Sequence, residues 1–207
     1  MERPIFNLQK QTSHGFTLVE TLVAVTILAF AIIGPFALSA QSLRASHDAR
    51  IELAATYLAL EGIEAVHSIR SNNSADDATV GHTDWMDNIV SGTCHPRGCV
   101  LDVTEQQASD VWTDDALISC PGGGCAARMV VYYNPNTGLY RQSDNALTAP
   151  WQMTTFTRRI DVTGIDNPGN PQRQVLVTVT VTYLGYGHKT RTITLTDNFY
   201  NWFPTLN

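Results

Sequence analysis

The most informative absence in this 207-residue chain is that of charge near the N-terminus. From Thr21 to Leu43 there is no Asp, Glu, Lys or Arg. Such a stretch is long enough to cross a hydrocarbon core of roughly 30 Å as a helix. The remaining residues are polar and mildly acidic, and the total length suits one globular domain with an extended element better than two domains.

Basic clusters and catalytic motifs are also missing. The formal net charge is -6, which argues against nucleic acid as a direct ligand of the polar region, although an assembly could still make a local contact. The histidines are scattered, and no nucleophile elbow, zinc-protease motif or phosphate-binding glycine loop occurs. The acidic pairs lack the spacing of a calcium loop and are interpreted as solvated surface. We predict no enzymatic activity and no cofactor.

Cysteine is scarce, and its placement is informative. All four cysteines follow the apolar run, in two C-x4-C pairs: Cys94 with Cys99 and Cys120 with Cys125. An even number there is typical of an oxidising, extracytoplasmic compartment, so we predict two disulfides. Pairing inside each local pair is favoured, but the sequence does not choose among three connectivities. A zinc site is the disfavoured alternative, because four intervening residues lie at the upper edge of the usual ligand spacing.

At the N-terminus, the apolar run and the expected cleavage site stand in the reverse of the order found in an ordinary secretory signal. Residues 1–14 are short and mostly polar, and the apolar run begins abruptly at Phe16. An ordinary secretory signal is cut after its apolar region, whereas the plausible cut here lies before it, between Gly15 and Phe16. An uncut signal-anchor helix is the alternative, but it leaves the Gly15–Phe16 step unexplained.

The string GFTLVETLVAVTIL, which begins at Gly15, resembles the prepilin N-terminal motif of type IV pilins and of the pseudopilins of type II secretion. In that family a membrane aspartyl peptidase cuts after the glycine and N-methylates the new terminal residue. The resemblance therefore implies a leader peptide over residues 1–15, processing at Gly15 and Phe16, and prepilin peptidase as a partner. A weaker likeness, from Tyr57 to Val66, is to the second helical half of minor pilins of the pilus-modification type and of the minor pseudopilins of secretion.

Glu20 lies one turn into the apolar segment. A carboxylate at membrane depth costs a few kcal/mol unless it is paired. In the resembled family the equivalent Glu neutralises the terminal amine of a neighbouring subunit. The resemblance thus implies that Glu20 and Phe16 form an assembly contact that is satisfied only in the polymer.

The Gly34–Pro35 step interrupts the apolar segment. Because proline removes a backbone donor and clashes with the preceding turn, we expect a kink or local melting there. Pilins often carry a proline in this part of the helix, which can unwind in the fibre, so the resemblance adds Gly34 and Pro35 to the assembly residues. A passive kink in a membrane helix is an equally good interpretation.

Residues 46–70 continue the helix with one apolar face. Apolar or small residues recur at intervals of three or four: Ile51, Ala55, Leu58, Gly62, Val66 and Ile69. The polar string from Arg70 to Asn73 predicts the end of the helix. A helix from Phe16 to about Ile69 would be on the order of 80 Å long.

Residues 80–207 are predicted to be mostly β. Strands are expected over 99–103, 127–133, 139–141 and 154–162, with a turn over 134–138 and loops over 71–80 and 166–172. The clearest signal is a hairpin that alternates from Val175 to Tyr183 and again from Lys189 to Leu195. Large aromatic residues are interpreted as packing rather than as a binding platform: Trp85, Trp112, Trp151, Tyr200, Trp202 and Phe203.

The predicted fold class is α+β and pilin-like, with a long N-terminal helix whose second half packs on an antiparallel sheet. Three parts follow: a leader over 1–15, a transmembrane and polymerisation helix over 16–45, and a globular head over 46–207. The resemblance implies a single-pass cytoplasmic membrane protein with its head outside, which then joins an extracellular pilus or pseudopilus. Its implied partners are membrane lipid before assembly, other pilin subunits and the inner-membrane assembly platform.

The function that these features favour is a structural subunit of a type IV pilus, with a minor pilin preferred. A pseudopilin of a type II secretion or DNA-uptake system would use the same polymer chemistry in a short piston. A tip adhesin with a ligand-binding head is a third hypothesis, and a plain bitopic membrane protein is a fourth. The sequence does not separate the first three.

Overall fold

The computed structural model describes residues 15, 17–76, 85–86, 89, 94–102, 116–122, 125–126, 128–143, 146–164 and 174–200, and side chains of α1 up to Asn73. The chain divides into two compact units, Met1–Ser46 and His47–Asn207, which we treat separately. We call the second unit the head. Phe16, the leader before Gly15, and the predicted loop over 166–172 lie outside the described residues, as do Trp112, Trp202 and Phe203.

A single helix, α1, runs from Leu18 to Asp76. The long N-terminal helix is therefore confirmed, but the prediction that Arg70 to Asn73 ends it is wrong. Residues 71–76 of the predicted 71–80 loop are helical, and residues 77–80 lie outside the described residues. No Gly or Pro stands between Arg70 and Asp76 to break the helix, the Ser71 hydroxyl donates to the His67 carbonyl at 2.8 Å, and Asn73 is buried. Packing thus outweighs the polar composition of the last turns.

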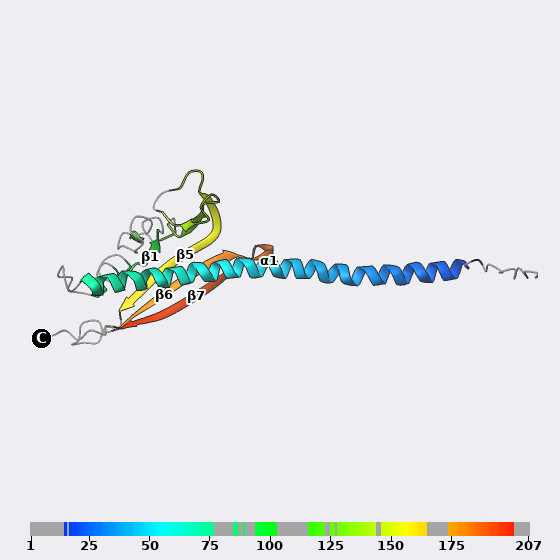
Figure 1. The fold of residues 1–207 in the computed structure, drawn as a ribbon, viewed down its shortest axis with the longest axis horizontal. Helices are drawn as coiled ribbons and strands as arrows, with labels where there is room; N and C mark the ends of the chain where they lie inside the picture. The colour runs from blue at the N-terminus through cyan, green and yellow to red at the C-terminus, as the bar shows by residue number, and fades with distance from the viewer. Residues whose placement is uncertain are drawn as a thin grey trace, which may run out of the picture. The chain divides into compact units, whose positions relative to one another are not determined.

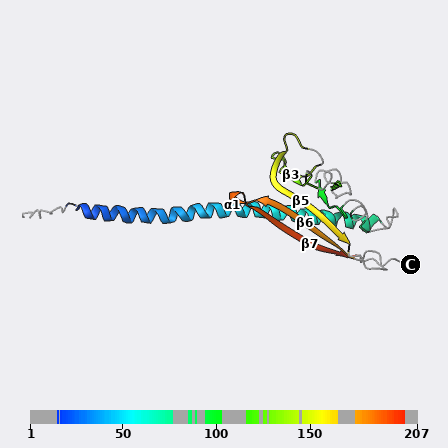
Figure 2. The same ribbon diagram turned by 180° about the vertical axis from the view of Figure 1, so that it is seen from behind.

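The head is built on an antiparallel sheet beside the second half of α1 (Figures 1 and 2). The long strand β5 pairs on one edge with β6, which pairs in turn with β7. On its other edge β5 pairs with β1 and β3, which carry the short strands β2 and β4. The strand bounds are β1 Cys99–Leu101, β2 Leu117–Ser119, β3 Val130–Tyr133, β4 Tyr140–Arg141, β5 Gln152–Gly164, β6 Gln174–Leu184 and β7 Thr190–Tyr200. This arrangement confirms the α+β fold class.

The predicted hairpin is present and is longer than the alternation indicated. β7 continues to Tyr200, five residues beyond Leu195, and β5 extends the expected 154–162 strand at both ends. The turn over 134–138 is confirmed, because the Gly138 N–H donates to the Asn134 carbonyl at 2.8 Å. β1 ends at Leu101 rather than at Val103, which is not described. β2 was not predicted, because a three-residue strand is too short to show alternation.

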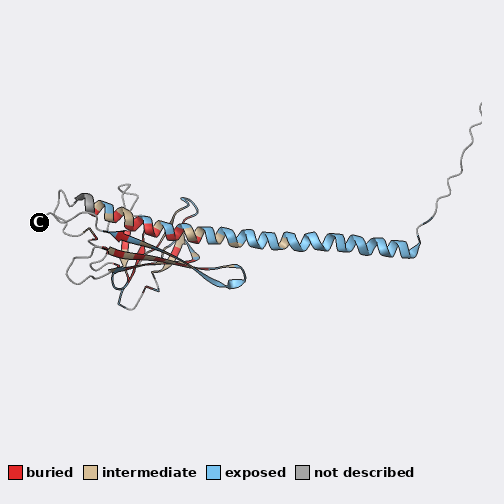
Figure 3. Ribbon diagram, turned by 90° about the horizontal axis from the view of Figure 1, so that it is seen from below, coloured by how far each residue is buried: buried red, intermediate tan, exposed pale blue. Residues whose placement is uncertain are grey.

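The core lies between one face of α1 and the sheet, as Figure 3 shows by the change from exposed to buried along the helix. The predicted stripe supplies Ala55, Leu58, Val66 and Ile69, each at most 3% exposed. The opposing residues are alternate valines of β6, together with Ile160 of β5: Val175, Val177, Val179 and Val181. At Gly62 an added Cβ would lie 3.0 Å from Cγ1 of Val179, so the helix and sheet approach closely there because Gly62 has no side chain.

Candidate functional site: the N-terminal processing and assembly segment

The helix start is defined by Thr17. Its hydroxyl oxygen accepts the Glu20 N–H at 3.3 Å, and its carbonyl accepts the Thr21 N–H at 3.1 Å. The sequence Thr17-Leu-Val-Glu20 is the pattern of a capping box, in which the first polar residue satisfies an orphan N–H of the first turn. The helix therefore begins after Thr17, and the Gly15–Phe16 bond precedes it. Gly15 is exposed and non-helical, as a peptidase substrate requires.

Glu20 is the acidic residue of the first turn of α1. There it complements the positive end of the helix dipole. A terminal amine on Phe16, created by cutting after Gly15, would add a positive charge at the same end of the helix. Among the residues that the structure describes, none forms an ion pair with the Glu20 carboxylate. The charge balance of this helix end is thus left to groups outside the described part of the chain or to another molecule.

The first half of α1 presents apolar side chains on every side. From Leu18 to Leu43 every large apolar side chain is more than half exposed, and Figure 3 colours nearly all of this part of the helix as exposed. By length and composition, the helix from Leu18 to Asn73 is long and apolar enough to cross a membrane. An apolar all-round surface of this kind requires lipid or neighbouring helices as its environment.

The few hydroxyls in this segment are satisfied within the helix. Thr21 donates to the Leu18 carbonyl and Thr26 to the Val23 carbonyl, each at 2.8 Å, and Ser39 donates to the Pro35 carbonyl at 2.9 Å. A hydroxyl bonded to its own helix backbone needs no water partner. These side chains are therefore compatible with a hydrocarbon environment.

Pro35 lies inside α1, and the helix is continuous from Leu18 to Asp76. The local melting expected at Gly34–Pro35 is not observed. Proline still lacks the N–H that would reach the Ala31 carbonyl, so the helix is one hydrogen bond short at this step. An added Cβ at Gly34 meets no described atom within 4 Å, so this glycine is not required by packing within the chain.

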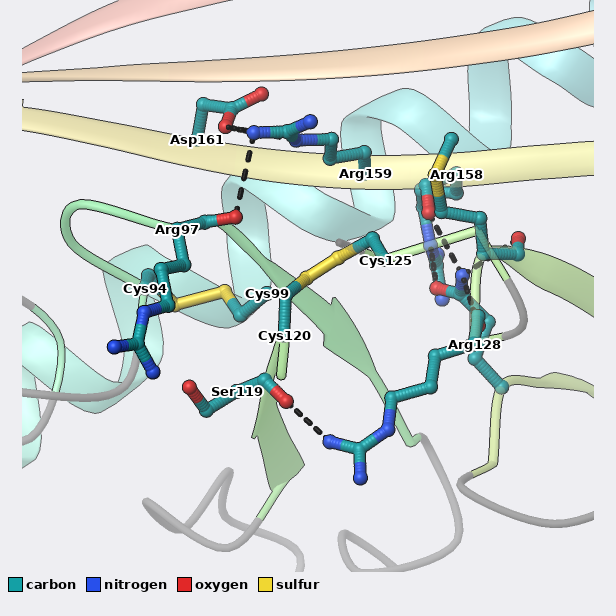
Figure 4. The surroundings of a disulfide bond; sticks show 12 residues. Cys94, Arg97, Cys99, Ser119, Cys120, Cys125, Arg128, Arg158, Arg159 and Asp161 are labelled. Carbon is teal, nitrogen blue, oxygen red and sulfur yellow. Dashed lines mark hydrogen bonds and ion pairs between the residues drawn. A yellow bond between two sulfur atoms is a disulfide. The ribbon is translucent and has the colours of Figure 1, made fainter. Parts of the chain in front are cut away.

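The four cysteines lie together on the β1–β2 side of the sheet (Figure 4). The structure pairs Cys94 with Cys99 and Cys120 with Cys125, with Cα–Cα distances of 4.6 Å and 4.8 Å. The two loops are joined by the backbone, since the Cys120 N–H donates to the Gly98 carbonyl at 3.1 Å. Pairing inside each C-x4-C unit is the connectivity that the sequence favoured. The Nδ1 atom of His95 donates to the Val162 carbonyl oxygen at 2.9 Å, and the described residues contain no group of three His, Cys, Asp or Glu side chains that could hold a metal ion.

Two of the aromatic residues that were interpreted as packing, Trp85 and Trp151, are half-buried. Trp85 packs against the core with the Arg70 guanidinium 5.5 Å above its ring, and Arg141 lies 5.4 Å over Trp151. Tyr200 is part-exposed at the end of β7. Burial, and secondarily the neighbouring Tyr133, raises the pKa of Tyr140 above its ordinary value of 10.0. Tyr140 is therefore neutral at physiological pH and serves as packing in the β3–β4 hairpin.

A buried arginine is the main feature that sequence reasoning missed. The guanidinium of Arg158 is fully buried and donates to the Leu58 carbonyl of α1 at 3.1 Å, to the Leu101 carbonyl at 3.2 Å and to Gln142 Oε1 at 2.9 Å. It also forms an ion pair with Glu61 of α1. One side chain thus links the helix to two parts of the sheet. A signal existed: Arg158 alternates in phase with Phe156, Ile160 and Val162, which are the core-facing positions of β5.

The comparisons with known proteins bear on the N-terminal segment alone. A family model described as the prokaryotic N-terminal methylation motif matches residues 10–34. That range contains the Gly15–Phe16 bond, the Thr17 cap, Glu20 and Gly34. This match supports a type IV pilin-like prepilin, a subunit of the pilin or pseudopilin type. No curated protein and no solved structure matches the chain.

Proposed function

We propose that this protein is a minor structural subunit of a type IV pilus, cut between Gly15 and Phe16 and assembled through residues 16–45. The observation that carries the proposal is the contrast within α1. Its first half exposes apolar side chains on all sides and carries the methylation motif, while its second half is buried in a head with its own core. In such a polymer, the apolar first halves of the α1 helices would pack together as the shaft, and the heads would form its surface.

Processing at Gly15 sets the chemistry of assembly. Cutting there removes residues 1–15 and leaves an amine at the start of a capped helix, beside the positive end of its dipole. Glu20 supplies the opposite charge one turn further on. In the membrane a single subunit bears the cost of an unpaired carboxylate, which is relieved when the Glu20 of one subunit meets the Phe16 amine of the next.

Localisation follows from the same features. We infer that the precursor spans the cytoplasmic membrane once, with the head outside, where an oxidising compartment maintains the two cysteine pairs. Prepilin peptidase, other pilin subunits and the inner-membrane assembly platform are the proposed partners. The proposed role is structural, without catalysis, and the head is not proposed to bind nucleic acid.

N-terminal mass spectrometry of protein from sheared surface filaments tests this function. The expected mature chain begins at N-methyl-Phe16, and Gly15→Val is expected to leave an uncut precursor in the membrane. An intact Met1 terminus in wild-type filaments would refute the processing proposal. Processed protein that stays in the cell envelope and never enters sheared filaments would favour a secretion pseudopilus instead.

Glu20→Ala tests the assembly contact. This variant is expected to insert and to be cut normally, but to enter filaments poorly beside wild-type subunits. Glu64→Ala is the matched control, because Glu64 is an exposed acid on the second half of the same helix. Equal incorporation of the two variants would show that the position of the carboxylate does not matter, and the registry role of Glu20 would be abandoned.

A further inference from the structure

The turn between β6 and β7 exposes apolar side chains at the tip of the longest hairpin. Leu184 is 37% exposed and Tyr186 is 51% exposed, and Lys189 follows them. The turn is tightly formed: Gly187 has φ +74° and His188 has φ +60°. A residue with a Cβ rarely adopts the left-handed region.

The turn is fastened to the first helical turn of the head. The carboxylate of Asp48 accepts the Tyr186 N–H at 2.8 Å and the Arg191 guanidinium at 3.3 Å. Arg191 also lies 3.9 Å from Glu52. Both nearby acids are therefore engaged by Arg191, while no described residue forms an ion pair with Lys189. The turn is thus held by Asp48, exposes apolar groups and carries a positive charge that forms no ion pair with the described residues.

The point of attachment is close to the apolar run along the chain. Asp48 is five residues beyond Leu43, where the uncharged stretch ends, which is about 7.5 Å of helix. The headgroup layer on each side of a bilayer is roughly 5–8 Å thick. Five residues span at most roughly 18 Å even when extended, so Asp48 and the turn that it holds are tethered within reach of headgroup depth in a bilayer that Thr21 to Leu43 spans. Tyr side chains and lysines with long stems are the residues that favour this depth.

We propose that the β6–β7 turn is a lipid-contact site of the unassembled subunit. Leu184 and Tyr186 enter the boundary between headgroups and acyl chains, and Lys189 lies against anionic lipid phosphates. The occupant is the bilayer in which the chain's own helix is anchored, so this inference rests on the proposed function. The contact fixes the orientation of the head on the membrane and is released when the subunit leaves the bilayer for the filament.

The test is a spin-label depth measurement on the full chain in phospholipid vesicles of phosphatidylcholine with phosphatidylglycerol. A cysteine introduced by Thr190→Cys, the first residue of β7, reports on the turn and leaves Leu184, Tyr186 and Lys189 unchanged. Thr196→Cys is the matched control, an exposed threonine of the same strand, and Ile33→Cys reports on the membrane segment. We expect the label at 190 to collide more with lipid-soluble oxygen than with a water-soluble nickel chelate, and the label at 196 to do the reverse.

Two further variants keep the outcome specific. Leu184→Ser with Tyr186→Ser should move the label at 190 toward the water-accessible ratio. Lys189→Glu should also move the label toward water, but only in vesicles that contain phosphatidylglycerol. For each charge unit changed, the equilibrium between the lipid-bound and the water-exposed turn should shift by about fivefold. The control Arg97→Glu, in the Cys94–Cys99 loop, should have no effect. The head fold of each variant is checked by its near-ultraviolet circular dichroism.

Each alternative outcome has its own meaning. A water-accessible label at 190 beside a lipid-accessible label at 33 would overturn the lipid contact and leave the anchored-subunit function intact. Water accessibility at both positions would overturn the membrane anchor and the proposed function with it. Protection of the label at 190 from both reagents, increasing with the protein-to-lipid ratio, would assign the turn to a second copy of the chain and would also overturn the proposal.

Discussion

The two halves of α1 have the same backbone conformation and opposite environments. In the first half, Leu18, Phe30 and Phe36 are each more than three-quarters exposed, and no face is polar. In the second half, Ala55, Ala59 and Val66 are fully buried against the sheet, and polar residues occupy much of the remaining face. Helix propensity alone does not distinguish them.

The difference shows where the stability of each half originates. The second half is held by apolar burial in the head and by side-chain contacts such as the pair between His67 and Asp197 at 2.8 Å. The first half makes its own backbone and hydroxyl hydrogen bonds but has nothing within the described chain to cover its apolar surface. We therefore expect lipid or neighbouring helices to cover the first half, whereas the head contains a buried core of its own.

The largest expected effect is the separation of the two parts. A fragment beginning near Ser46, exported to an oxidising compartment, should be soluble, monomeric and cooperatively folded, and it should form no filaments. The mature chain from Phe16 should require detergent or lipid. Size-exclusion chromatography and chemical unfolding of the two proteins provide the measurement. A fragment that aggregates or remains unfolded with its disulfides intact would show that the head needs its membrane helix to fold.

The next largest effect is expected from Arg158→Met, which tests how much the buried network around Arg158 stabilises the head. The substitution removes the ion pair with Glu61, whose side chain is 32% exposed, and the guanidinium hydrogen bonds to Gln142 and to two backbone carbonyls; a hydrogen bond to a charged group contributes about 1.5–3 kcal/mol. Arg159→Met is the control on the same strand, because the Arg159 side chain is 38% exposed and an exposed pair contributes under about 1 kcal/mol. Denaturant midpoints of the two variants should differ clearly, and equal losses would show that the buried network does not stabilise the head.

Much of this comparison could be predicted from the sequence, because it depends on periodicity. The uncharged run, the stripe from Ile51 to Ile69 and the alternating valines of β6 are regular patterns that report directly on environment. The methylation motif could be identified because its residues are contiguous. These local regularities predict a processing site and distinguish the two halves of the helix without knowledge of the tertiary fold.

The rest depended on contacts between distant parts of the chain. The polar composition from Arg70 to Asn73 predicted the end of the helix there, whereas the helix continues to Asp76 and the Asn73 side chain is buried. The partners of Arg158 lie on α1, β1 and the segment after β4, so its burial could be inferred only from its phase in β5. The role of Asp48 in holding the β6–β7 turn joins residues 138 positions apart, and no local pattern indicates it.

The disulfides give a smaller effect, confined to the head. Intact-mass analysis of protein from the cell surface, alkylated under denaturing conditions, should find no free thiol and should find four after reduction. Peptide mapping should join Cys94 to Cys99 and Cys120 to Cys125. Replacing either pair by serines should lower the unfolding free energy by about 2 kcal/mol, from the loop entropy of a short crosslink.

That loss should leave insertion and processing of the first half of α1 unchanged. Disulfides that cross between the two loops, free thiols, or a stoichiometric bound zinc in the purified protein would contradict the pairing.

The smallest effect compares two glycines of one helix. At Gly62 an alanine would gain roughly 0.5–1 kcal/mol in helix propensity but would place its Cβ 3.0 Å from Cγ1 and 3.1 Å from Cγ2 of Val179. Overpacking of this kind costs about 1–3 kcal/mol, so Gly62→Ala should destabilise the head by up to about 2 kcal/mol, and Gly62→Val by more. Gly34→Ala meets no atom within 4 Å and should not change head unfolding.

Adding Val179→Ala should recover part of the Gly62→Ala loss, because it removes the two methyl groups that clash. A double-mutant cycle followed by tryptophan fluorescence measures that coupling. Additive losses in the cycle would show that the close approach of α1 to β6 does not limit the side chain at position 62, and a change in head unfolding with Gly34→Ala would show that the two halves of the helix are energetically coupled.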